Sequence, residues 1–120
     1  MDDEKSSALY RRFPALKGIE HHGMAIGNGW HDLLEQLLLD IERLNPTGFK
    51  ILQIKEKFGG LRFYFQVDPE FQDTMNEMVA QAERVAEKTC EVCGELGELR
   101  VDRPWLKTLC DTHSVIKRSA

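Results

Sequence analysis

The sequence predicts an α+β fold in which two amphipathic helices pack on an antiparallel β-hairpin, followed by a small lobe built around cysteine and histidine. Two segments, residues 29–45 and 68–88, carry apolar residues at helical spacing. Between them, two strand-like segments flank a Gly-Gly pair, and the second alternates apolar with polar residues. Two equally spaced pairs of metal-ligating residue types follow, namely Cys90, Cys93, Cys110 and His113.

The chain of 120 residues is long enough for one domain, and 42% of it is hydrophobic. We expect a core over residues 1–88, with 1–7 as a flexible tail, and a metal-binding lobe over residues 89–120. The net charge of −4 gives no general reason to expect a nucleic-acid partner. The acidic N-terminus is unlike a secretory signal, and no apolar run approaches the roughly 20 residues of a membrane span. These features favour a cytoplasmic protein.

Before the first long helix, the sequence predicts little regular structure. Residues 8–14 are consistent with a short helical turn that Pro14 ends, and residues 15–29 read as a glycine-rich loop containing His21 and His22. Asn28 or Gly29 then begins the helix, which Asn45-Pro46 ends. Its apolar stripe consists of Trp30, Leu33, Leu34, Leu37, Leu38, Ile41 and Leu44.

The hairpin is predicted as strands at residues 50–57 and 61–67, with Gly59 and Gly60 supplying the positive φ angles of the turn. Asp68 and Pro69 then provide an N-cap and a first helical residue. The buried stripe of this second helix consists of Phe71, Met75, Met78, Val79, Ala82, Val85 and Ala86. The helix leads almost directly into Cys90.

The cysteine and histidine spacing predicts one tetrahedral Zn²⁺ site of the Cys3His type. Each pair of ligands is three positions apart, 16 residues separate the pairs, and Gly94 allows the tight turn that a Cys-x-x-Cys knuckle needs. Four protein ligands leave no position for water or substrate, which makes the metal structural. Unpaired core thiols, one disulfide, or a Cys-x-x-Cys redox site are the alternatives. The odd cysteine count and the matched second pair argue against the last two.

Residues 98–101 and 105–109 are predicted as two short strands, followed by a helix that carries the last two ligands and continues through residues 114–117. Knuckle, hairpin and helix in this order resemble a treble-clef zinc finger over residues 88–118. We expect Trp105 and Leu109 to cover the metal site. The basic side chains of the lobe should project outward, namely Arg100, Arg103 and Lys107.

Four sequence blocks resemble a group of small bacterial and phage-type proteins of unassigned function. They are Gly29-Trp30, the Lys-Glu-Lys-Phe-Gly-Gly-Leu-Arg stretch within residues 54–64, the Cys-Glu-Val-Cys-Gly knuckle within 89–94, and residues 105–111. The resemblance carries no activity over to this chain. It implies only a phage or mobile-element setting, in which small accessory proteins inhibit a toxin or a defence enzyme.

The hairpin is locally basic, because four basic residues against one acidic residue give residues 49–67 a charge of +3. A solvated outer face explains this charge, and so does a binding surface for an acidic protein or a phosphate backbone. The candidate binding residues are Lys50, Lys55, Lys57, Arg62 and Tyr64.

Three functions therefore follow from the sequence. We favour a non-catalytic protein-binding module, such as an inhibitor, immunity protein or phage accessory factor. The alternative is a nucleic-acid-binding regulator that uses the basic hairpin and the arginines of the lobe. An enzyme that uses His21, His22 or His31 with Asp32 ranks last, because their arrangement matches no mechanism.

Overall fold

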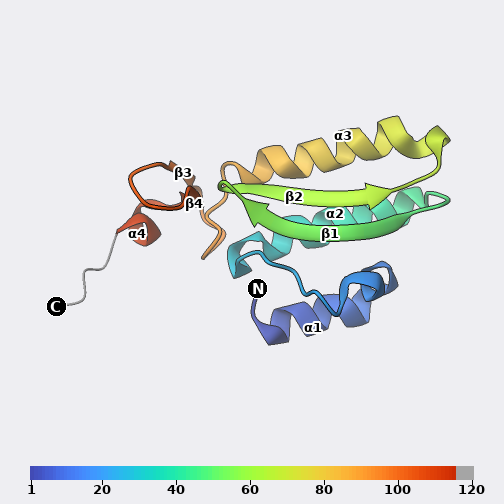
Figure 1. Ribbon diagram of the computed structural model, residues 1–120, viewed down its shortest axis with the longest axis horizontal. Coiled ribbons are helices and arrows are strands. Elements are labelled where there is room, and N and C mark those ends of the chain that lie inside the picture. Colours follow the sequence, from blue (N-terminus) through green and yellow to red (C-terminus); the bar gives the residue numbers. More distant parts are fainter. Residues whose placement is uncertain (116–120) are drawn as a thin grey trace.

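A computed structural model describes residues 1–115 of the protein. Figure 1 shows a core of three longer helices and a β-hairpin, with a smaller lobe beside the hairpin turn. We call this smaller part, residues 89–115, the Cys/His lobe. The elements of the core are α1 (Asp3–Arg12), the 3-10 helices η1 (Pro14–Ile19) and η2 (Asn28–Trp30), α2 (His31–Leu44), β1 (Lys50–Lys57), β2 (Gly60–Gln66) and α3 (Pro69–Ala86). Those of the lobe are β3 (Glu98–Arg100), β4 (Lys107–Leu109) and α4 (Asp111–Ser114).

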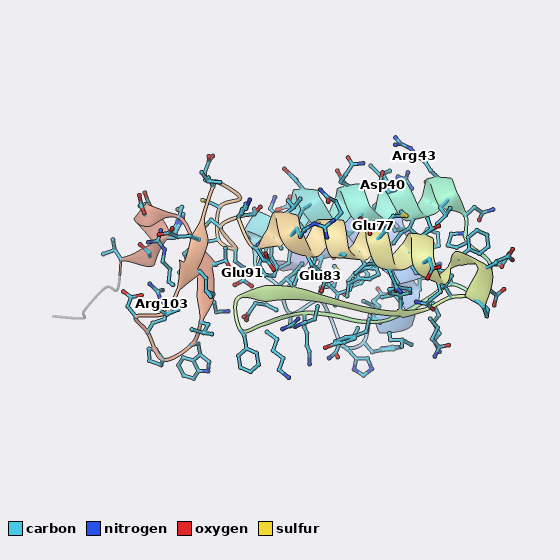
Figure 2. The ribbon with its side chains drawn as sticks, turned by 90° about the horizontal axis from the view of Figure 1, so that it is seen from above. Asp40, Arg43, Glu77, Glu83, Glu91 and Arg103 are labelled. Atoms are coloured by element: carbon cyan, nitrogen blue, oxygen red, sulfur yellow. The ribbon has the colours of Figure 1, made fainter. Side chains whose placement is uncertain are left out.

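The predicted mixed fold is confirmed, since α2 and α3 pack against each other and lie on one side of the antiparallel β1–β2 hairpin (Figure 2). The apolar stripes predicted for the two helices face this layer boundary. Trp30, Leu34 and Met75 are fully buried there. Inward side chains of both strands complete the core, including Ile51, Ile54, Leu61 and Phe63. Among the described residues, none of the helices has the length and apolar character that a bilayer span requires.

The prediction of a tail at residues 1–7 is wrong, because most of them form α1. Asp2 caps this helix by accepting a hydrogen bond from the backbone N–H of Lys5 at 2.8 Å. Leu9 buries its side chain in the core, and Arg12 makes two 3.0 Å hydrogen bonds to the carboxylate of Glu42 on α2. The polar composition of the segment concealed a helix that needs only one apolar anchor.

The loop predicted for residues 15–29 is also more ordered than expected. It contains η1 and η2, and it buries Leu16, Ile19, Met24 and Ile26 in the core. Their irregular spacing matches neither helix nor strand, which is why the sequence showed no period. Ala25 pairs with β1 as a single parallel bridge, donating to Ile54 O at 3.3 Å and accepting from Glu56 N at 2.9 Å. This bridge covers the outer edge of β1.

The hairpin prediction is confirmed, but its turn and register differ in detail. Phe58 and Gly59 adopt the positive φ angles, 54° and 81°, while Gly60 belongs to β2. A two-residue turn with both central φ values positive matches the right-handed twist of the strands. An irregularity between Ile51 and Gln53 shifts the pairing, so that Ile51 and Ile54 both face the core.

Candidate metal centre

The four predicted metal ligands come together in the Cys/His lobe. One ligand atom from each of Cys90, Cys93, Cys110 and His113 lies within 4.8 Å of all the others. The sulfurs of Cys93 and Cys110 are 3.7 Å apart, and His113 Nδ1 lies 3.6 Å from Cys90 Sγ and 3.2 Å from Cys110 Sγ. A tetrahedral Zn²⁺ with bonds of about 2.3 Å to sulfur and about 2.0 Å to nitrogen requires spacings of roughly 3.8 Å and 3.5 Å. The observed distances therefore fit such an ion.

The first two ligands are held by a tight knuckle. Gly94 adopts φ +83° and donates its N–H to Cys90 O at 2.9 Å, which closes the turn. Cys90 N donates in turn to Glu95 O at 2.7 Å. A residue with a side chain would be strained at this φ, so the glycine predicted from the sequence is required here.

The second pair sits at the start of α4, directly after β4. Cys110 precedes the helix and accepts a 2.9 Å backbone hydrogen bond from Ser114 at its O atom, which places His113 one turn away on the same side. Arg100 of β3 pairs with Asp111 at 2.8 Å and donates to Leu109 O at 3.1 Å. These bonds connect the β3–β4 hairpin to the helix that carries the ligands. The continuation of this helix predicted for residues 114–117 is absent at Val115, where the chain is extended, and residues 116 and 117 lie outside the described residues.

The environment of Cys90 favours its thiolate form. Burial raises the pKa of this fully buried thiol, but hydrogen bonds from the backbone N–H groups of Cys110, Cys93 and Val92 outweigh burial and lower the pKa to about 6. A thiolate is the form that binds Zn²⁺. The three cysteines are free thiols, and the shortest S–S spacing given above far exceeds the roughly 2.05 Å of a disulfide. The site is thus suited to a metal ion and has no disulfide to exchange.

The knuckle is inserted against the turn that precedes α2. Gly29 N donates to Glu91 O at 2.8 Å, and the indole of the buried Trp30 donates to Thr89 O at 2.9 Å. A Cβ on Gly29 would overlap the carbonyl of Cys90 and lie 2.5 Å from Gly94 N. The Gly29-Trp30 block is therefore a docking seat that only a glycine backbone can provide.

Glu91 fastens the knuckle from inside this junction. Its side chain is buried, with one carboxylate oxygen accepting from Gly27 N at 3.1 Å and the other accepting from Lys107 Nζ at 3.3 Å. Its backbone N–H donates to Thr108 O at 3.0 Å. Figure 2 shows Glu91 at the boundary between the lobe and the core.

The β3–β4 hairpin docks on the turn between β1 and β2. Thr108 is buried and its hydroxyl donates to Gly59 O at 2.7 Å. Lys107 Nζ contacts Glu56 Oε1 at 2.7 Å as well as Glu91. All four blocks that carried the family resemblance thus meet at one interlocked junction beside the Cys/His cluster, although they span most of the chain.

Two expectations for the lobe are wrong. Trp105 is 76% exposed and does not cover the cluster, whereas Leu109 is buried as expected. Lys107 points into the junction instead of outward. Arg100 and Arg103 have largely buried side chains, and Arg103 donates to Ser114 O at 2.6 Å. Sequence reasoning missed Glu56, Glu91 and Thr108, because a buried polar contact between distant segments leaves no local pattern.

The five candidate binding residues lie together on the outer face of the β1–β2 hairpin. Lys55 pairs with Arg62 across the strands, and Tyr64 is opposite Gln53 with the ammonium of Lys55 5.8 Å from its ring. Lys57 closes the turn and lies 5.4 Å from the ring of Phe58. Lys50 is at the far end of β1, opposite Gln66. The cross-strand pairing, which alternates with the buried pairs, is what places them on one face.

The histidines outside the cluster do not form a catalytic group. His31 Nδ1 contacts Asp32 Oδ1 at 2.9 Å, at the start of α2. His22 lies after η1 and lines a hollow with Tyr64, while His31 lines a different hollow with Cys93. His21 is in the exposed turn beside His22. The residues proposed for an enzyme are thus divided between two surfaces.

A scan against protein-family models, a search of curated proteins and a search of solved structures each returned no match to this chain.

Proposed function

We propose that this chain is a non-catalytic, zinc-stabilised binding protein that acts through protein–protein contacts. The observation that carries the proposal is the closed cluster of Cys90, Cys93, Cys110 and His113, whose four ligand atoms lie within 4.8 Å of one another. Four protein ligands complete the tetrahedral shell of Zn²⁺, so the ion holds the lobe in place and takes no substrate. In this proposal the lobe is treble-clef-like, because the knuckle, hairpin and short helix supply the ligands in that order.

The junction between lobe and core supports a scaffold role for the metal. The ion fixes the knuckle, and the knuckle holds the turn before α2 and the tip of the β1–β2 hairpin through Gly29, Glu91 and Thr108. A metal that stabilises two surfaces at once is typical of structural zinc. The proposed setting is a phage or mobile-element accessory protein, inhibitor or immunity protein in the cytoplasm, where cysteines stay reduced.

The alternative is a nucleic-acid-binding regulator that uses the outer face of the hairpin. Lys55, Arg62 and Tyr64 lie side by side there, and a basic row with an aromatic ring can contact a phosphate backbone and a base. The arginines of the lobe do not extend this surface, because Arg100 and Arg103 are engaged within the lobe. The protein-binding function is therefore the stronger proposal.

The test is affinity capture from the cells that naturally produce the protein, with the full zinc-loaded chain as bait. Captured proteins are identified by mass spectrometry and captured nucleic acid is quantified in the same eluate. We expect one protein at near-stoichiometric yield that persists when salt is raised from roughly 0.1 M to 0.5 M. A Cys93→Ser bait, in which the lobe is loosened, serves as the control and should retain less of it. Capture of nucleic acid alone, lost steeply over this salt range, would replace the proposal with the alternative.

A further inference from the structure

One edge of the β1–β2 hairpin is open. Ala25 bonds to Ile54 O and Glu56 N, so these two β1 residues direct their backbone groups away from β2. In an antiparallel ladder their cross-strand partners direct theirs to the opposite edge, and these partners are Phe63 and Leu61. Within residues 1–115, no other segment forms a backbone or side-chain hydrogen bond with this edge of β2. The edge is a row of donors and acceptors that a further strand can use.

A groove runs along the open edge. It has a volume of about 690 Å³ and lies between the start of β2, the C-terminal half of α3 and the β3–β4 hairpin. Gly60, Leu61 and Arg62 line it from β2, and Ala80 and Glu83 line it from α3. Figure 2 shows Glu83 between α3 and the hairpin, on the side of the helix that faces this space. The groove is wide enough for an extended chain, which binds such an edge by main-chain hydrogen bonds.

The chemistry of the groove selects the strand. Four of the charged lining side chains are basic, namely Lys57, Arg62, Arg84 and Lys88, and two are acidic, Glu83 and Glu87. Within the described residues, Arg84 bonds to Gln81 and Glu77, whereas Lys57, Arg62 and Lys88 have no carboxylate within 4.0 Å. These three free cations favour acidic side chains. A second copy of this chain would bring like charges together, which disfavours self-pairing.

The two faces of an added strand meet different surroundings. Side chains on its outer face lie next to Arg62 and the row of Lys55, where carboxylates are stabilised. Those on its inner face meet Glu83 and Ala80, where a carboxylate would be repelled and a small apolar side chain fits. At the end near the Cys/His lobe, the exposed rings and methyl groups of Phe58 (65% exposed) and Leu99 (47% exposed) offer apolar contact.

We propose that the β2 edge and its groove bind an extended segment of a partner protein, in which acidic residues alternate with apolar ones, as an added β-strand. This inference rests on the proposed function and specifies the surface and the kind of partner. The backbone of Leu61 and Phe63 supplies the affinity, and Arg62 supplies the preference for acidic segments.

The experiment selects phage-displayed random peptides, about 10 residues long, on the full zinc-loaded chain. We expect enrichment of peptides that alternate acidic with apolar residues. Synthetic versions should slow amide hydrogen exchange at Leu61 and Phe63. Arg62→Glu should weaken their binding about fivefold, and Ala80→Arg, which fills the groove, should weaken it more. Arg43→Glu, a charge reversal at the exposed end of α2, is the matched control and should leave binding unchanged.

Enriched peptides that protect other amides, or that bind Arg62→Glu and Ala80→Arg as well as the unaltered chain, would overturn the inference. So would enrichment of nothing above background, or a β2 edge already protected by self-association in sedimentation and exchange measurements. A protein captured from cells whose binding ignores both variants would leave the proposed function standing while this surface is rejected. Capture of nucleic acid alone would reject the proposed function, whatever the peptides show.

Discussion

Lys107 and Glu56 are 51 positions apart in the sequence, yet Lys107 Nζ lies 2.7 Å from Glu56 Oε1. The contact joins β4 of the Cys/His lobe to the last part of β1. The same ammonium lies 3.3 Å from Glu91 Oε1, so one cation sits between two carboxylates from separate segments. The side chains of Glu56 and Glu91 are only 15% and 8% exposed. Lys107 is therefore the electrostatic link between metal site and core.

Replacing Lys107 with Met should destabilise the docked lobe. The substitution keeps much of the aliphatic stem but leaves two poorly solvated carboxylates without their cation. We expect a loss of about 1–3 kcal/mol in the free energy of unfolding, measured by urea denaturation at neutral pH. Faster amide exchange should appear at the tip of β1–β2 and in the knuckle. Arg84→Met is the matched control, since Arg84 is exposed and bonds only within α3; an equal loss there would contradict the role given to Lys107.

Gly29→Ala should separate the knuckle from its seat. The added Cβ would overlap Cys90 O and lie 2.5 Å from Gly94 N, both of them backbone atoms that cannot move aside without opening the turn. We expect a destabilisation of about 1–3 kcal/mol or more, together with weaker zinc retention in a chelator competition. Gly18→Ala is the control, because a Cβ there meets nothing within 4 Å and needs no unusual φ. If the two variants behaved alike, close backbone approach at Gly29 would not matter.

The parts of the fold that sequence predicts well are those governed by local regularity. The stripe from Trp30 to Leu44 and the Cys-x-x-Cys spacing each follow from a short-range geometric rule, and the structure brings these residues to the expected places. The bulge near Leu52 breaks such a rule, since strict alternation would have put Ile51 and Ile54 on opposite faces. Periodicity cannot anticipate it.

The junction could not be predicted for a different reason. Lys107 reads as an exposed lysine of a short strand, and Trp105 reads as a buried aromatic, because residue type was the only guide. The structure reverses both, since the position of each relative to β1 depends on contacts across more than 40 residues. Residues such as Glu91 carry no local signal except their place inside the knuckle.

Removal of the metal should affect more than the Cys/His lobe. Because the knuckle holds Gly29 and Glu91 holds Gly27, chelation should speed amide exchange in residues 89–115 and also in residues 27–30, while α2 and the remainder of α3 stay protected. Elemental analysis of the tag-free protein should show one zinc per chain before treatment. Cys93→Ser should reproduce the effect, and His22→Ala should not. Exchange unchanged after verified metal loss would show that the four side chains hold the lobe without an ion.

The attachment of α1 to α2 should weaken in acid. The hydrogen bonds from Arg12 lower the pKa of the Glu42 carboxyl below its ordinary value of 4.5. A carboxyl whose pKa is lower in the folded state contributes stability above its unfolded pKa, and that contribution disappears as pH falls through the folded value. The stability difference between the unaltered chain and Arg12→Gln should thus be constant near neutral pH and vanish below the lowered pKa. Urea denaturation across this range measures it. Because both side chains are about half exposed, high salt should shrink the difference as well, and a difference that persisted unchanged in strong acid would place the anchoring of α1 in Leu9 alone.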